Sequence, residues 1–205
     1  FPRIEKKADA PILNLSLFKS RQTVIASILS AGAGLGESGM VFIPALAVGA
    51  MPAIINTHNA SYLLMPVVLA MAVGSPLVGR LLDKFGSKVM VFGGTFLLAV
   101  GMMMLSSGMN SMLWGFIASG VVIGLGLSSL LGAPMRYIML NEASAEDRTS
   151  AQGVITLFTS VGQMASSAIV GAVAASMGGG VMGYSSAYMV VGVIAAIMVI
   201  LTLGL

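Results

Sequence analysis

The sequence Gly79-Arg80-Leu81-Leu82-Asp83-Lys84-Phe85-Gly86-Ser87-Lys88 joins two long apolar stretches of the chain, residues 62–82 and 89–106. A helix needs about 20 apolar residues to cross a bilayer, so each stretch is of membrane-spanning length. Four of the ten joining residues carry charge, and charged side chains are costly inside a membrane. This segment therefore predicts a charged turn at a membrane surface between two transmembrane helices.

The composition of the whole chain extends this prediction. Of 205 residues, 57% are hydrophobic and only 8% are charged, whereas about a quarter of the residues of a soluble domain carry charge. This balance indicates a protein embedded in a lipid bilayer. Six apolar segments have the length of a membrane helix, namely residues 22–48, 62–82, 89–106, 112–139, 151–176 and 184–205.

These segments favour helices over barrel strands. Strands of a membrane barrel are about 10 residues long and alternate between apolar and polar side chains. The segments here are longer, continuously apolar and rich in glycine and alanine, which is typical of packed membrane helices. We predict an all-α polytopic membrane protein with six transmembrane helices.

The positions of the basic residues predict the orientation. Lys and Arg concentrate in the cytoplasmic loops of membrane proteins. All ten basic residues lie before the first segment, between the second and third, or beside the link from the fourth to the fifth, and the links 49–61, 107–111 and 177–183 carry no charged side chain. We expect a multi-pass protein of the plasma or inner membrane with both termini cytoplasmic. Because acidic residues alternate with these basic ones, we expect no nucleic-acid partner.

The scarcity of reactive side chains argues against an enzyme. The chain has no cysteine and a single histidine, His58, so we expect no disulfide, no metal site and no cofactor. Residues 36–39 read Gly-Glu-Ser-Gly, which fits the Gly-x-Ser-Gly pattern of an intramembrane serine protease. His58 lies in an expected outer link, however, so a catalytic Ser–His pair inside the membrane is not expected. We predict no catalytic residues.

The charged segment resembles a known signature. The cytoplasmic loop of the major facilitator superfamily has the pattern Gly-x-Leu-x-Asp-(Arg/Lys)-x-Gly-(Arg/Lys)-(Arg/Lys), and Ser87 replaces one of its bases. The resemblance implies half of a major facilitator fold, in which six helices form two three-helix inverted repeats. The matching positions are Gly79, Leu81, Asp83, Lys84, Gly86 and Lys88.

The signature has a physical interpretation. Gly86 can adopt a turn with positive φ, and Asp83 can contact a helix N-terminus or a basic side chain. Such a contact would stabilise one conformation, so we expect a conformational latch formed by Gly79, Asp83, Lys84, Gly86 and Lys88. The alternative is a charged hairpin that only sets the topology.

Two features resemble the second half of such a transporter. First halves of drug antiporters carry an Arg in the fourth span and a Gly-Pro-x-x-Gly-Gly type sequence in the fifth, and this chain has neither. Residues 146–148 and 151–163 resemble the second half of fourteen-span drug:proton antiporters. We therefore expect residues 22–205 to be a C-terminal six-span half and residues 1–21 a cytoplasmic linker or interfacial segment. Because the chain begins with Phe1, we expect a fragment or processed half that pairs with a missing N-terminal half or a second copy.

One carboxylate lies apart from the surface segments. Glu37 lies about fifteen residues into the first apolar segment, whereas the other acidic residues lie in segments expected at the cytoplasmic surface. A charged carboxylate near the bilayer centre costs on the order of 3 kcal/mol, so the protonated form is favoured there. Glu37 is therefore a candidate for proton coupling or substrate contact. A permanently protonated Glu37, hydrogen-bonded to a neighbouring helix, is the alternative.

Helical spacing predicts the surroundings of Glu37. Small residues and Met40 share its face of the helix, and we expect Met40 to line a substrate cavity. Ile28, Leu35 and Phe42, spaced by seven residues, form a bulky ridge on the other side, which we expect to face lipid.

The fifth apolar segment carries a polar stripe. Its members recur every three or four residues and thus share one helical face. In the superfamily this span lines the transport cavity, so we expect the stripe to contact substrate; hydrogen bonding between helices is the competing interpretation. The stripe consists of Gln152, Thr156, Thr159, Gln163 and Ser166.

Together these features predict half of a proton-coupled efflux antiporter. The partners would be protons and an amphipathic or cationic small molecule, exchanged as the two halves rock about the cavity. An uptake or other solute transporter of the same superfamily, and a six-span membrane scaffold without transport activity, are the alternatives.

Overall fold

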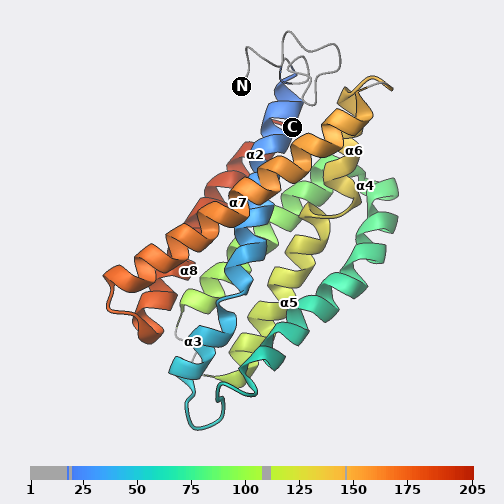
Figure 1. Ribbon diagram of the computed structural model, residues 1–205. Coiled ribbons are helices and arrows are strands. Elements are labelled where there is room, and N and C mark those ends of the chain that lie inside the picture. The colour runs from blue at the N-terminus through green and yellow to red at the C-terminus, as the bar shows by residue number, and fades with distance from the viewer. Residues whose placement is uncertain (1–17, 19, 108–111, 146) are drawn as a thin grey trace.

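The computed structural model describes residues 18, 20–107, 112–145 and 147–205, and these are arranged as a bundle of helices without strands (Figure 1). The prediction of an all-α fold is confirmed. Most of the predicted interfacial segment, residues 1–17 and 19, lies outside the described residues. The helices are α2 (Arg21–Met40), α3 (Ile43–Ala50), the 3₁₀ helix η2 (Ala60–Leu64), α4 (Met65–Ser106), α5 (Leu113–Leu130), α6 (Ala133–Glu142), α7 (Arg148–Ser176) and α8 (Gly180–Thr202).

Among the described residues, five helical stretches are long and apolar enough to cross a membrane. The second and third predicted segments both lie in α4, because only Gly86 separates the helix before it from the helix after it. The joining turn is therefore shorter than the sequence predicts. Only Gly86 departs from helical geometry, with φ 80° and ψ 163°. The five stretches are Arg21–Ala50, Ala60–Ser106, Leu113–Glu142, Arg148–Ser176 and Gly180–Thr202.

Gly86 divides α4 into two arms that both pack on α5. A Cβ atom placed on Gly74, in the first arm, would lie 2.6 Å from Ser128 Oγ. One placed on Gly94, in the second arm, would lie 2.6 Å from Ser129 Cβ. Because Ser128 and Ser129 are neighbours, Gly74 and Gly94 lie at the same level of the bundle.

A second pair of contacts gives the direction of the arms. A Cβ atom on Gly101 would lie 2.5 Å from Ile123 Cγ1, and one on Gly124 would lie 2.3 Å from the Val67 carbonyl oxygen. Val67 and Gly101 are therefore also level with each other. Both pairs are centred near residue 84, so the chain reverses there and the two arms of α4 run antiparallel, as Figure 1 shows.

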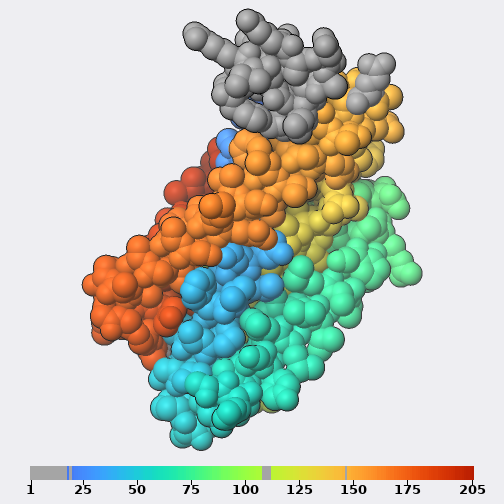
Figure 2. All heavy atoms as spheres, in the orientation of Figure 1, coloured from blue at the N-terminus to red at the C-terminus, as the bar shows by residue number. Residues whose placement is uncertain are grey.

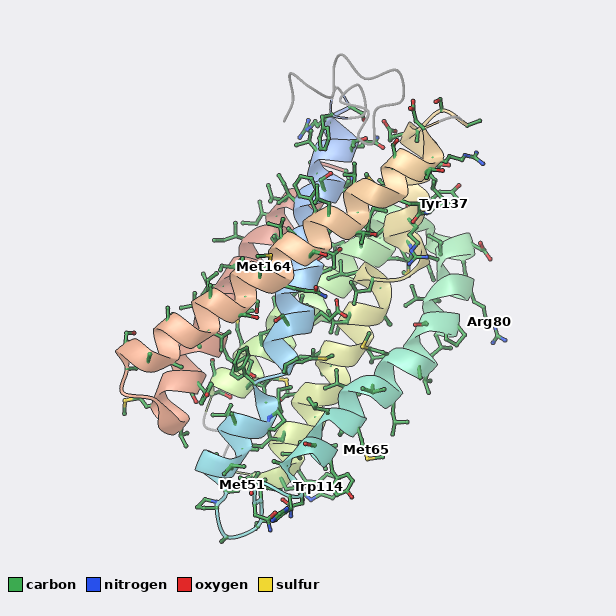
Figure 3. All side chains as sticks on the ribbon, in the orientation of Figure 1. Met51, Met65, Arg80, Trp114, Tyr137 and Met164 are labelled. Carbon is green, nitrogen blue, oxygen red and sulfur yellow. The ribbon has the colours of Figure 1, made fainter. Side chains whose placement is uncertain are left out.

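The basic segments gather at one end of the bundle. The Arg21 guanidinium lies 3.0 Å from where a Cβ atom on Gly204 would be, and Lys88 Nζ donates a 3.4 Å hydrogen bond to the Leu203 carbonyl oxygen. The start of α2, the turn of α4 and the end of α8 thus meet at this end, which we call the basic end. Figure 3 shows Trp114 at the opposite end.

Two of the apolar stretches are broken helices. Residues 41 and 42 separate α2 from α3, and residues 131 and 132 separate α5 from α6. Pro44 and Pro134 lie in the first turn of α3 and α6, where a proline costs no helical hydrogen bond. The hydroxyl of the buried Tyr188 donates a 2.9 Å hydrogen bond to the Gly39 carbonyl oxygen beside the first break. The break is therefore fixed by a contact from α8.

Candidate functional site

The candidate site lies where α2 and α7 cross. A Cβ atom on Gly34 would lie 1.9 Å from the Thr159 carbonyl oxygen, and one on Gly162 would lie 1.8 Å from that of Ala31. No side chain fits at either position, so the two backbones touch, as small residues permit between membrane helices. Figure 2 shows α7 lying across the front of the bundle, with part of α2 visible beside it.

This crossing brings Glu37 and Gln163 together. Gln163 Nε2 donates a 2.9 Å hydrogen bond to Glu37 Oε2. Glu37 lies one helical turn after Gly34, and Gln163 follows Gly162 directly, so the backbone contact fixes the distance between the two side chains. Both side chains are half-buried. The sequence predicted each of them as a site residue, but not that they are partners.

A second hydrogen bond lies beside the first. The hydroxyls of Ser38 and Ser167 are 2.9 Å apart, and Ser167 Oγ donates to the Gln163 carbonyl oxygen at 3.1 Å. Since a hydroxyl carries one proton, Ser38 is then the donor to Ser167. The sequence analysis missed both serines as site residues. Their adjacency to Glu37 and Ser166 was the available indication.

These side chains line a pocket of about 380 Å³. The pocket contains three predicted site residues, Glu37, Met40 and Gln163, together with the exposed Met164 that Figure 3 labels on α7. It combines a carboxylate, an amide and two hydroxyls with apolar walls. Such a combination can bind an organic cation or a neutral polar group. The lining residues are Glu37, Ser38, Met40, Val41, Gln163, Met164 and Ser167.

The other members of the polar stripe have different surroundings. Thr156 is exposed and its hydroxyl donates to the Gln152 carbonyl oxygen of its own helix at 3.1 Å. Ser166 is fully buried, 3.5 Å from where a Cβ atom on Gly39 would lie, and its hydroxyl has no partner among the described residues. The stripe thus follows the border between the packed and exposed faces of α7. Of its members, Gln163 lines the pocket.

The predicted lipid-facing ridge on α2 is wrong at Leu35. Leu35 is 8% exposed, whereas Ile28 is 38% exposed, and the Phe42 ring packs against Tyr184 with centroids 6.3 Å apart. The reason is that α2 packs mainly on α7 and α8 and is also contacted by α4, α5 and α6, so little of its surface is free. For example, the Leu98 side chain of α4 packs against Gly36, where an added Cβ atom would lie 2.8 Å from it.

The charge of Glu37 has no basic counterpart in the described chain. No Lys or Arg among the described residues lies within ion-pair distance of its carboxylate, and the hydrogen-bond partner is a neutral amide. In that same part of the chain, no three His, Cys, Asp or Glu side chains lie close enough to hold a metal ion. The pocket therefore presents one carboxylate whose hydrogen-bond partner is a neutral amide.

The predicted latch residues are placed along the turn of α4. Gly86 has the positive φ that the signature predicts, and Lys88 contacts the end of α8. Lys84 Nζ lies 5.3 Å from the centre of the Phe85 ring. Asp83 is exposed and makes no hydrogen bond or ion pair within the described residues, so the contact expected of it is not formed inside this part of the chain.

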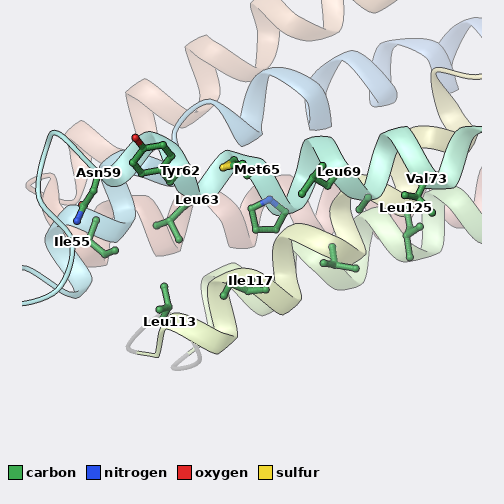
Figure 4. Close-up of a pocket in the computed structure, with 13 residues that line it drawn as sticks. Ile55, Asn59, Tyr62, Leu63, Met65, Leu69, Val73, Leu113, Ile117 and Leu125 are labelled. Atoms are coloured by element: carbon green, nitrogen blue, oxygen red, sulfur yellow. The ribbon is translucent and has the colours of Figure 1, made fainter.

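A larger cavity, of about 680 Å³, lies between the first arm of α4 and α5 (Figure 4). Asn59 and Tyr62 lie at one end of it, and apolar residues such as Leu69, Val73 and Leu125 line the remainder. The sequence did not indicate this cavity, because apolar residues at helical spacing are equally typical of a lipid-facing surface. Its lining holds no carboxylate or amine, so it offers mainly apolar contact, with the Asn59 amide and the Tyr62 hydroxyl at one end.

Comparison with known proteins finds transporters of similar sequence. The chain is 28% identical over 163 residues to the uncharacterized MFS-type transporter YfiU of Bacillus subtilis, and this alignment covers 78% of the chain and 30% of YfiU. It is 25% identical over 186 residues to the multidrug resistance protein Stp of Mycobacterium tuberculosis, with 86% of this chain and 32% of Stp covered. It is 25% identical over 175 residues to the multidrug transporter protein MdtP of Bacillus subtilis, with 83% of this chain and 31% of MdtP covered. The chain spans less than a third of the length of these relatives.

A family model also matches most of the chain. The model of the Major Facilitator Superfamily matches residues 23–205, which include nearly all of α2 and every later helix. It covers the turn of α4, the crossing of α2 with α7, and the Glu37 pocket. The chain therefore belongs to the Major Facilitator Superfamily, a family of membrane transporters and not of enzymes.

Proposed function

We propose that this chain is the C-terminal six-span half of a proton-coupled efflux transporter for amphipathic or cationic small molecules. The observation that carries the proposal is the hydrogen bond between Glu37 and Gln163 in a pocket between two apolar helices. The names of two relatives, a multidrug resistance protein and a multidrug transporter, support the substrate class.

Six spans follow if each arm of α4 crosses the bilayer separately. Residues 65–85 and 87–106 each extend about 30 Å as a helix, which matches the hydrocarbon thickness. The first repeat is then α2–α3 with the two arms of α4, and the second is α5–α6 with α7 and α8. Because Lys and Arg favour the cytoplasm, the basic end lies there, together with both termini.

Proton coupling follows from the energetics of a single carboxylate. Protonation of Glu37 removes a charge whose burial costs on the order of 3 kcal/mol. A cationic substrate in the pocket compensates the same charge. Proton and cation therefore compete for the Glu37 carboxylate, so that arrival of a proton releases the cation. The amide of Gln163 can serve as hydrogen-bond donor to the carboxylate and, after rotation, as acceptor from the acid.

Exchange across the membrane requires the pocket to open alternately to each side. Substrate would bind between this half and its partner, and the halves would rock about the pocket. Asp83 is exposed at the turn of α4, where it can contact the partner half in one of the two conformations. The latch of Gly79, Asp83, Lys84, Gly86 and Lys88 would thus act between halves.

A purely structural hydrogen bond is the competing interpretation of the Glu37–Gln163 contact. Neutral Glu37 would then stabilise the crossing of α2 and α7 without titrating during transport. A pH gradient distinguishes the two interpretations, because only a titrating group responds to it.

The proposal is tested with the full-length transporter in proteoliposomes. An imposed pH gradient should drive accumulation of a lipophilic cation such as tetraphenylphosphonium, and a protonophore should abolish it. Equal accumulation with and without the gradient would contradict proton coupling.

A further inference from the structure

A third cavity, of about 510 Å³, lies away from the Glu37 pocket, between the end of α4 and the first turns of α8. It is at the end of the bundle opposite the basic end. Its lining consists of methionine and serine residues only, so it presents thioether and hydroxyl groups and carries no charge. The lining residues are Met103, Ser106, Ser107, Met182, Ser185, Ser186 and Met189.

Helix periodicity explains how these side chains converge. The α8 members are at positions i, i+3, i+4 and i+7, which share one helical face. Met103 and Ser106, at i and i+3 of α4, face them, and Ser107 follows the last residue of that helix. Gly192 lets the two helices approach, because an added Cβ atom there would lie 2.9 Å from Met103 Cγ. The Ser106 hydroxyl donates to Met189 Sδ at 3.5 Å, which places that sulfur on the α4 side of the cavity.

The chemistry of this lining selects a soft cation. Thioether sulfur is a soft, neutral ligand that favours Cu(I), whereas carboxylates and carbonyls suit hard divalent ions. The lining supplies three thioethers and no carboxylate. Met182 is 73% exposed and Met189 is 51% exposed, so both can be reached from outside the bundle.

We propose that Met103, Met182 and Met189 form a binding site for a soft monovalent metal cation, Cu(I) or its redox-stable analogue Ag(I), at the expected outer surface. The hydroxyls of the neighbouring serines complete a polar wall around the cation. This site is independent of Glu37 and of proton coupling.

Titration with Ag(I) tests the site. In a chloride-free buffer, the purified full-length transporter should bind Ag(I) with an affinity that the double variant Met182→Leu/Met189→Leu loses, because leucine preserves the apolar volume without the sulfur. The matched control is Met112→Leu/Met177→Leu. Met112 and Met177 are similarly exposed, at 68% and 55%, but lie outside the cavity lining. Ag(I) binding that is equal in the two double variants would overturn the proposal.

A measurement on the unmodified protein removes any dependence on folding of the variants. Oxidation by peroxide converts methionine to its sulfoxide, and a bound cation shields the ligating sulfur. Ag(I) should therefore slow oxidation of Met182 and Met189, read by mass spectrometry, relative to Met112 and Met177. Equal rates at all four residues would contradict the site.

Discussion

Glu37 Oε2 and Gln163 Nε2 lie 2.9 Å apart across the contact of α2 with α7, although 126 positions separate the two residues in sequence. Their distance is set by the backbone contacts at Gly34 and Gly162, one turn and one residue away. The hydrogen bond therefore depends on how closely α2 and α7 approach. Any change that separates these helices should separate the carboxylate from the amide as well.

Gly162→Ala should destabilise the transporter. The added Cβ atom would lie 1.8 Å from the Ala31 carbonyl oxygen, so α7 must move away from α2. Overpacking of this kind costs about 1–3 kcal/mol. Thermal unfolding in detergent should show a lower Tm. The matched control is Gly171→Ala on the same helix, where no atom lies within 4 Å of the added Cβ; equal Tm values for the two variants would mean that the crossing is not tight.

Gly86→Ala should weaken the turn between the arms of α4. The backbone there has φ 80° and ψ 163°, a region that residues with a Cβ atom occupy only at a cost of about 1–3 kcal/mol. We expect a lower Tm and less folded protein in the membrane. Gly79→Ala, at a helical position with no atom within 4 Å of the added Cβ, should leave both unchanged. If the two variants behave alike, the turn does not depend on glycine.

Single cysteines test the proposed topology. The chain has no cysteine of its own, so Ser87→Cys, Thr149→Cys and Thr57→Cys can each be placed in a full-length protein freed of other cysteines. A membrane-impermeant maleimide should label the first two only from the cytoplasmic side and Thr57→Cys only from outside. Labelling of Ser87→Cys and Thr57→Cys from the same side would rule out the six-span arrangement.

Asp83→Asn should slow transport without preventing membrane insertion. The carboxylate is exposed and contributes no hydrogen bond or ion pair within the described residues, so its removal should leave this half of the protein intact. Its expected role is to stabilise one conformation of the complete transporter. Exchange rates in proteoliposomes should fall while the amount of inserted protein is preserved. A wild-type exchange rate would support a role in topology alone.

The sequence predicts the long membrane helices well because each lies in a long apolar run. Hydropathy alone places α7 and α8 to within a few residues, and the signature identifies Gly86 as the positive-φ position of the turn. The breaks after α2 and α5 are harder to predict. Pro44 and Pro134 mark them, but proline is common in membrane helices and does not by itself specify a break.

Helical periodicity in the sequence does not predict which residues of different helices contact each other in the site. Glu37 and Gln163 were each identified from a polar side chain in an apolar helix, yet their pairing depends on how α2 packs on α7, which no local pattern contains. The prediction that Leu35 faces lipid is wrong for the same reason. The spacing places Leu35 on a ridge with Ile28, and only the positions of the neighbouring helices show that it is buried. Cavities between helices, such as the one beside Tyr62, are likewise a property of packing.

The most direct test of proton coupling is Glu37→Gln in the full-length transporter. Glutamine keeps the shape and hydrogen-bonding capacity of the protonated acid but cannot titrate. Because it mimics the protonated state, this variant should bind tetraphenylphosphonium more weakly. In proteoliposomes with an imposed pH gradient it should fail to accumulate this cation, whereas the control Glu142→Gln, at the basic end, should accumulate it as the wild type does. Accumulation by Glu37→Gln at the wild-type rate would contradict the proposal that this carboxylate couples protons to transport.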